Sequence, residues 1–348
     1  AEQLYRKILA QEPDLFKACY HFANLLQETG RLEEAMYSYE HALKLIPDYE
    51  YLLSIKITTQ MKLCEWSGLT ADLQMLSAKI LEHKKVAKPY HLLGLLDNPE
   101  LQKKAAEDYN KTKYPASQKR PIFHIRRTDE KLRIGYYSAG FREHALSYVM
   151  IKRLEEHDKD KIELYGFSLF ESNNQDAMRQ RISKAFTKFY DVAKMSDLDV
   201  ALMSRELGID IAIDLTGYNA HERTAIFANY CAPIQINAIG YPGTMGAPYI
   251  DYMITQKSII QPEDQHHYPE KIIYLPVNLK PAQNIDQRVS REKYGLPKKG
   301  FVFCCFNSNE KILPDTFDSW MRILQSIEGS VIWLIVNNIE AIKNLRKE

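Results

Sequence analysis

The chain has 348 residues, enough for two or three domains, and its 45% hydrophobic and 26% charged content is ordinary for a globular protein. A net charge of +1 excludes bulk electrostatic attraction to nucleic acid or to an anionic membrane, so neither is expected as a partner. No apolar run approaches the roughly 20 residues that span a bilayer, and the five cysteines lack paired spacing, which favours reduced thiols and a cytoplasmic location.

The first part of the chain repeats itself with a period of about 34 residues. Ala1–Tyr5 aligns with Ala35–Tyr39, one complete unit spans Phe16–Tyr49, and a weaker unit follows over Glu50–Lys79. The pattern resembles the tetratricopeptide repeat, in which antiparallel helix pairs stack into a superhelix with a concave binding face. Because Ala1 matches the start of a second helix, we expect the chain to begin within a repeat. An ordinary helical hairpin with a capping helix is the alternative.

An α/β region follows the repeats. We predict helical repeats and connecting helices over 1–110, a polar linker over 111–131, and a first Rossmann-like lobe over 132–290. In this lobe strands alternate with helices of about 10–15 residues, which is typical of a doubly wound parallel sheet. The predicted strands are Leu132–Ser138, Ile162–Phe170, Lys188–Val192, Ile209–Leu215, Ile234–Ile239, Tyr249–Thr255 and Lys271–Leu275, and the predicted helices are Ser147–His157, Gln175–Phe186 and Leu198–Leu207.

A second α/β lobe is predicted over 291–348. Its strands are expected at Phe301–Phe306 and Val331–Val336, and its helices at Pro314–Ile327 and Ile339–Lys347. Cys304 and Cys305 fall inside an apolar run and are expected in the core. Two strand–helix units are too few for a stable open sheet, so we expect this lobe to be incomplete.

Two buried-type strands of the first lobe end abruptly in glycine turns. Ile209–Leu215 stops at Thr216 and Gly217, and Ile234–Ile239 stops at the segment Gly240–Thr244. Ligands of open α/β sheets bind at the carboxyl ends of such strands, and glycine lets backbone N–H groups approach a phosphate or sugar. Tight turns without a ligand are the alternative.

Six segments in this order resemble the O-linked N-acetylglucosamine transferases, including the SPINDLY-type proteins. The similarity covers essentially the whole chain. The segments are Cys64–Trp66 (C-D/E-W), Leu132–His144 (L-R-x-G-Y-x-S-x-D-F-x-x-H), Asp214–Tyr218 (D-L-x-G-Y/H), Ala232–Gln235 with Gly240–Thr244 and Asp251–Tyr252 (A-P-x-Q…G-Y-P-G-T…D-Y), Tyr294–Pro297 (Y-G-L-P), and Phe306–Lys311 (F-N-x-x-x-K).

The resemblance implies a GT-B fold, with two Rossmann-like lobes holding a sugar nucleotide between them. It implies a protein O-glycosyltransferase that moves GlcNAc from UDP-GlcNAc to Ser or Thr, with inversion and with neither metal nor cofactor. Acceptor polypeptides are expected on the face of the tetratricopeptide repeats. The family's H-x-T-G-x-D nucleotide-binding segment does not occur in the 348 residues, so the chain alone is expected to be inactive.

The resemblance also implies site residues. Lys311 matches the lysine that contacts the diphosphate, and His144 matches an active-site histidine that contacts acceptor or sugar, with proton removal as the alternative role. The remaining matches are the substrate-binding residues Thr216, Gly217, Gly240, Pro242, Gly243 and Thr244 on the sugar side, and Asn307 and Ser308 beside the phosphates.

Several alternatives stay open. An O-fucosyltransferase that uses GDP-fucose, as SPINDLY-type members do, is one alternative. It stays open because the 348 residues do not contain the segment that reads the base. A repeat scaffold with an inactive α/β body is a second alternative. A nicotinamide enzyme is disfavoured because no G-x-G-x-x-G follows Ile134. A metal site at His266 and His267 is disfavoured because adjacent side chains point apart.

Overall fold

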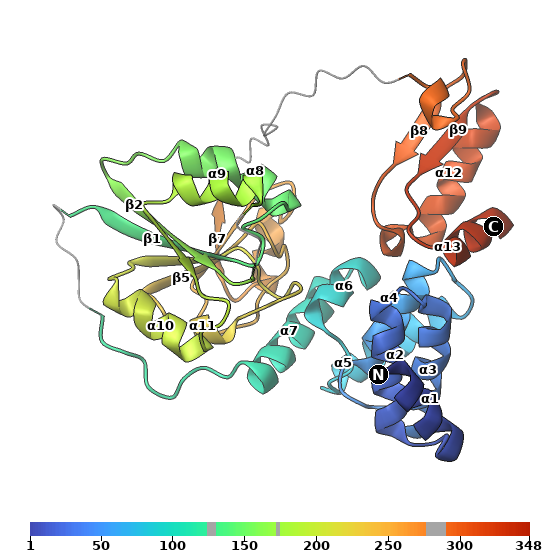
Figure 1. The fold of residues 1–348 in the computed structure, drawn as a ribbon, viewed down its shortest axis with the longest axis horizontal. Coiled ribbons are helices and arrows are strands. Elements are labelled where there is room, and N and C mark those ends of the chain that lie inside the picture. Colours follow the sequence, from blue (N-terminus) through green and yellow to red (C-terminus); the bar gives the residue numbers. More distant parts are fainter. Residues whose placement is uncertain (124–129, 172–174, 276–289) are drawn as a thin grey trace. The chain divides into compact units, whose positions relative to one another are not determined.

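The computed structural model describes residues 1–123, 130–171, 175–275 and 290–348. These form two compact units, one from Ala1–Asp97 with the described part of Asp286–Glu348, the other from the described part of Asn98–Ile285 (Figure 1). None of the described helices combines the length and apolarity that crossing a bilayer requires. Arg126 and Arg127, two basic residues of the predicted linker, lie outside the described residues.

The first unit begins with stacked antiparallel helices, as the repeat predicts. Three alanines that allow the helices to approach closely, Ala23, Ala35 and Ala42, are fully buried. The Tyr39 hydroxyl of α3 donates a hydrogen bond to the side-chain Oδ1 of Asn24 in α2 at 2.7 Å. The helices are α1 (Glu2–Gln11), α2 (Phe16–Glu28), α3 (Leu32–Leu45), α4 (Leu52–Lys62), α5 (Leu69–Leu81) and α6 (Pro89–Leu95).

The same unit contains the second α/β element. Strands β8 (Val302–Cys305) and β9 (Val331–Leu334) pair in parallel, and α12 (Pro314–Ser326) and α13 (Ile339–Lys347) accompany them. Short 3-10 turns η2 (Glu292–Tyr294) and η3 (Asn309–Lys311) flank β8. The predicted order of strands and helices is therefore confirmed in this region.

The helical repeats and this small sheet share a hydrophobic core. Cys64, directly after α4, is buried together with Ile312, Phe317, Ala341 and Leu345, and Trp66 packs on the ring of Phe317. Two side chains of the α13 segment complete the C-terminus of α4. Asn338 donates to the Lys62 carbonyl at 3.0 Å, and Asn344 donates to the Leu63 carbonyl at 2.9 Å. These bonds satisfy carbonyls that a helix end leaves without an internal partner.

The expected burial of Cys304 and Cys305 is wrong. Cys304 is exposed and Cys305 only half-buried. In the β8–β9 register Cys304 pairs with Trp333, on the face opposite Leu334, which packs against the shared core. The strand alternates, so its apolar composition does not bury both cysteines.

The second unit is a seven-stranded, all-parallel sheet in the order β3-β2-β1-β4-β5-β6-β7. This confirms the predicted doubly wound architecture, with α8 and α9 on one face and α10 and α11 on the other (Figure 1). The strands are β1 (Leu132–Ser138), β2 (Ile162–Ser168), β3 (Lys188–Asp191), β4 (Ile211–Asp214), β5 (Ile234–Ala238), β6 (Tyr252–Thr255) and β7 (Lys271–Tyr274). The helices are α8 (Ala145–Glu155), α9 (Ala177–Ala185), α10 (Asp197–Glu206), α11 (Ala225–Ala228) and the 3-10 helix η1 (Pro262–His267).

One further helix, α7 (Pro99–Lys113), belongs to the sheet unit. The Asn110 amide of α7 donates to the Tyr249 hydroxyl at 2.6 Å and to the Tyr218 hydroxyl at 3.2 Å, and both tyrosines lie in loops of the sheet unit. The predicted division at 110/111 therefore falls inside a helix that packs on the loops of the sheet. The domain boundaries proposed from the sequence remain predictions.

Candidate functional site

Three loops meet at the carboxyl ends of β1, β4 and β5. At the end of β4, the Asp214 carboxylate accepts the backbone N–H of Thr216 at 2.8 Å and of Gly217 at 3.0 Å. The Thr216 hydroxyl accepts the N–H of Ala139 at 3.0 Å, which ties the loop after β1 to the loop after β4. Asp214 is fully enclosed, and burial raises the pKa of its carboxyl to about 6.

The two predicted glycine turns pack directly against each other. A β carbon on Gly240 would lie 1.7 Å from the Leu215 carbonyl oxygen. Gly217 has a φ of +55°, and a β carbon there would lie 2.3 Å from Cβ of Tyr241. Glycine is therefore required at both positions by the approach of two loops, whether or not a ligand binds above them.

The segment Gly240–Thr244 is held from inside the protein. The Asn237 amide donates to the carbonyls of Tyr241 at 3.1 Å and Gly243 at 3.4 Å. The Thr244 hydroxyl donates to the Glu270 carboxylate at 2.8 Å, and burial raises the pKa of Glu270. The sequence motifs mark neither residue. Asn237 lies just before the loop, between the two motif segments, and Glu270 acts on the loop from 26 residues further along the chain.

Most of the predicted sugar-side residues support the loops in this structure. Thr216, Gly217, Gly243 and Thr244 are buried, whereas Gly240 is half-buried and Pro242 exposed. Their roles as substrate contacts stay predictions.

His144 lies on the loop after β1 and caps the N-terminus of α8. Its Nδ1 accepts the N–H of Leu146 at 3.2 Å. Partial burial, and then the nearby Arg142 guanidinium, lower the pKa of His144 below its ordinary value of 6.5. The ring is therefore neutral at neutral pH, and the bond at Nδ1 places its proton on Nε2. An exposed imidazole with an N–H at its outer edge is suited to donating a hydrogen bond.

In the other unit, one loop brings together Asn307, Ser308 and Lys311 directly after β8. Asn307 and Lys311 are exposed and Ser308 is half-buried, and the Lys311 N–H donates to the Ser308 carbonyl at 3.0 Å. Between them Asn309 is 3% exposed, and neither amide atom has a hydrogen-bond partner among the described residues. Sequence reasoning missed Asn309, although a buried amide without partners is unusual.

His144 and Lys311 belong to different compact units. The shared crevice expected between them stays a prediction. Both side chains are exposed on their loops and are accessible to a ligand.

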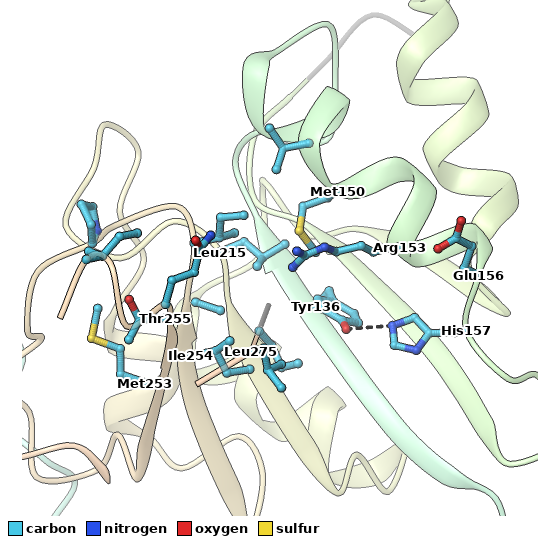
Figure 2. A pocket seen from close by; sticks show the side chains of 17 residues that line it. Tyr136, Met150, Arg153, Glu156, His157, Leu215, Met253, Ile254, Thr255 and Leu275 are labelled. Atoms are coloured by element: carbon cyan, nitrogen blue, oxygen red, sulfur yellow. Dashed lines mark hydrogen bonds between the residues drawn. The ribbon is translucent and has the colours of Figure 1, made fainter. Parts of the chain in front are cut away.

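A cavity of about 650 Å³ lies in the sheet unit, on the side of α8, with Leu215, Ile239 and Pro242 in its lining (Figure 2). Its walls are mainly apolar. Figure 2 shows Arg153 extended across this lining, and the Tyr136 hydroxyl 3.1 Å from His157 Nε2. An apolar lining of this kind suits hydrocarbon groups and not a diphosphate.

Within the described residues, no group of three or more His, Cys, Asp or Glu side chains is arranged to hold a metal ion. The His266 and His267 rings lie 3.8 Å apart between centroids and are tilted by 42°, so the expectation that they point apart is wrong. His266 Nδ1 lies 2.7 Å from the Glu263 carbonyl oxygen.

Comparisons with known proteins agree with this architecture. The model of glycosyl transferase family 41 matches residues 109–280 and 280–347. The chain is 36% identical over 215 residues to the probable UDP-N-acetylglucosamine–peptide N-acetylglucosaminyltransferase SEC of Arabidopsis thaliana, covering 59% of this chain and 22% of that protein. It is 30% identical over 205 residues to the similarly named SPINDLY protein of Petunia hybrida, covering 58% of this chain and 22% of that protein.

A solved structure shares the fold. A mutant of the Thermobaculum terrenum O-GlcNAc transferase aligns with a TM-score of 0.73 at 22% identity, over 99% of this chain and 68% of that chain. The chain spans about a fifth of the length of the curated relatives it matches, which are 22% covered. Because the family model covers most of the sequence in both lobes, the chain belongs to glycosyl transferase family 41.

Proposed function

We propose that this protein transfers GlcNAc from UDP-GlcNAc to Ser or Thr hydroxyls of polypeptides. The observation that carries the proposal is the family 41 match, which extends through both α/β regions. The names of the SEC and SPINDLY relatives support the same donor and a peptide acceptor. The reaction breaks the bond between the sugar C1 and the diphosphate oxygen and forms a bond from the acceptor oxygen to C1. The acceptor proton leaves to a base.

Lys311 is proposed to stabilise the departing diphosphate. Its ammonium is exposed on the loop after β8, beside Asn307 and Ser308. A fixed cation that meets the charge developing on the leaving group substitutes for a metal ion, so the proposed reaction needs no metal or other cofactor. Asn307 and Ser308 supply hydrogen-bonding groups on the same loop.

His144 is proposed to position the sugar or acceptor and not to remove the proton. With Nδ1 bonded to Leu146, the neutral ring presents an Nε2–H, which donates a hydrogen bond and cannot accept a proton there. Acting as a base would first require the proton to move between the two ring nitrogens. Attack of the acceptor oxygen on the face of C1 opposite the diphosphate gives inversion at C1. We also expect the protein to act in the cytoplasm.

The test measures transfer and donor choice with the complete gene product. Radiolabelled UDP-GlcNAc and GDP-fucose are each supplied with a Ser/Thr peptide, with and without EDTA, and the product's anomeric linkage is read by NMR. We expect a β-linked GlcNAc peptide, unaffected by EDTA. Labelling from GDP-fucose alone would establish the O-fucosyltransferase alternative, and an α linkage would exclude inversion. Absence of transfer from either donor, with polypeptide binding retained, would favour the scaffold alternative.

A further inference from the structure

A second, polar cavity of about 280 Å³ lies in the helical repeats and is formed by α2, α4 and α6. It is separate in the chain from all the loops described above, and all of its lining belongs to Ala1–Asp97. We call it the repeat pocket. Its lining includes Asn24 and Gln27 from α2, Lys62 at the end of α4, and Lys88 and His91 around the start of α6.

The carboxamide side chains of the repeat pocket have their acceptor atoms occupied. The Tyr39 hydroxyl donates to Asn24 Oδ1 at 2.7 Å, and the Thr59 hydroxyl donates to Gln27 Oε1 at 2.8 Å. In the described part of the chain the NH₂ groups of Asn24 and Gln27 have no such partner. The two amides are therefore fixed by internal bonds with their donor groups left for a ligand.

The pocket also holds two ammonium groups that no carboxylate neutralises. Neither Lys62 nor Lys88 forms an ion pair with any residue that the structure describes. Lys88 is held in place by its backbone N–H, which donates to the Ser54 hydroxyl at 3.0 Å. Burial lowers the pKa of His91 to about 3, with the charges of Lys88 and Lys62 acting in the same direction.

The charge balance of the repeat pocket is therefore positive. His91 is neutral, and the one carboxylate in the described lining, Glu28, is exposed. Two ammonium groups and two amide NH₂ groups face one exposed carboxylate. A ligand rich in acceptor oxygens and carrying negative charge complements this lining.

We propose that the repeat pocket binds an acidic side chain, Asp or Glu, of an acceptor polypeptide. That the polypeptide is an acceptor rests on the function proposed above; the preference for a carboxylate rests only on the pocket. The amide donors bind carboxylate oxygens or the adjoining peptide carbonyls, and Lys62 and Lys88 supply the opposite charge.

The test measures binding without any sugar donor, so it is independent of transfer. Fluorescein-labelled 15-residue peptides of Ser, Thr, Ala and Gly, each with one Glu or with Gln at the same position, are titrated with the 348-residue chain by fluorescence anisotropy. We expect about fivefold tighter binding of the best Glu peptide, a difference that shrinks at high salt. The double variant Lys62→Met and Lys88→Met is expected to abolish the difference, whereas Lys7→Met, an exposed lysine of α1, is expected to leave it unchanged.

Equal affinities for Glu and Gln peptides, or a preference that survives in the double variant, would overturn the proposal. Displacement of the peptide by micromolar free glutarate would also overturn it, because the pocket would then be a small-carboxylate site. Retained circular dichroism and an unchanged melting temperature show that the double variant is folded. If the preference is present but the complete gene product transfers no sugar, the proposed function fails and the pocket assignment stands.

Discussion

Gly240 and Leu215 are in contact through their backbones, so closely that a β carbon on Gly240 would lie 1.7 Å from the Leu215 carbonyl oxygen. The loops after β4 and β5 are locked together at this point. Neither loop can carry a larger residue there without moving the other.

The variant Gly240→Ala is expected to destabilise the sheet unit by more than about 3 kcal/mol, because backbone and not a flexible side chain must move. The control is Gly94→Ala in α6, where a β carbon meets nothing within 4 Å. That change is expected to be neutral, or stabilising by up to about 1 kcal/mol. Chemical denaturation of both variants measures the difference. Similar stabilities would show that the two loops separate more easily than the structure indicates.

Removing the imidazole of His144 is expected to reduce transfer by about 100-fold while the fold is retained. The side chain is exposed and its Leu146 bond involves only one helix-end N–H, so His144→Ala has little structural cost. His266→Ala, at another exposed histidine of the same unit, is the control.

The pH profile of transfer separates a positioning role from a structural one. Because the pKa of His144 is lowered below 6.5, the neutral ring persists until the pH falls below that value. Protonation puts a second proton on Nδ1, which can then no longer accept the Leu146 N–H, so the ring loses the bond that positions it. We therefore expect an acidic limb below pH 6.5 in the natural protein and its loss in His144→Ala. An unchanged limb in the variant would remove His144 from the mechanism.

Lys311→Met is expected to reduce transfer by about 100- to 1000-fold, because the leaving diphosphate loses its fixed cation. Lys299→Met, at an exposed lysine just before β8, is the matched control. Single-turnover measurements with the complete gene product, and UDP affinity by calorimetry, report the two effects separately. Near-normal turnover in Lys311→Met would assign the diphosphate to other residues.

The buried Asp214 makes stability depend on pH. Its pKa of about 6 in the folded protein exceeds the ordinary value of 3.8, so its contribution is fully present below about pH 3.8 and is lost as the pH rises through 6. The difference in unfolding free energy between the natural protein and Asp214→Asn should therefore shift against the natural protein by about 3 kcal/mol across this window. Urea titrations at several pH values measure it. A difference that does not change with pH would show that the pKa of Asp214 is the same in the folded and the unfolded protein.

Asn344→Ala is expected to destabilise the first unit by about 1–3 kcal/mol, because the Leu63 carbonyl loses its donor. Lys343→Ala, next to it on α13 and exposed, removes only a surface ion pair with Glu340 and is expected to change stability by less than about 0.5 kcal/mol. Equal effects of the two changes would show that water replaces Asn344 at this helix end.

The order of helices and strands can be predicted from the local hydrophobic pattern of the sequence. Their exact ends depend on contacts with other segments, which the local pattern does not show. The strand predicted from Ile209 begins at Ile211, because the Ile209 N–H donates to the Ser204 carbonyl and closes α10. The strand predicted from Tyr249 begins at Tyr252, because the Tyr249 side chain is engaged by Asn110 of α7.

Some residues of the candidate site can be predicted from the sequence and others cannot. The glycine turns and Lys311 stand at recognisable positions of motifs in the sequence. Asn237 and Glu270 do not, because they support the Gly240–Thr244 loop through the packed interior. Asn309 is buried by the contact of η3 with α4, which are far apart in sequence. Long-range packing of this kind becomes visible only once the chain is folded.

The contact between α4 and η3 has a consequence for the proposed binding of acceptor polypeptides. Helix α4 ends in Lys62 of the repeat pocket, and η3 ends in Lys311. Because α4 and η3 pack together, they set the distance between an acidic residue bound in the repeat pocket and Lys311, the cation proposed to bind the diphosphate. This fixed distance would favour polypeptides in which a set number of residues separates the anchored Asp or Glu from the Ser or Thr to be modified.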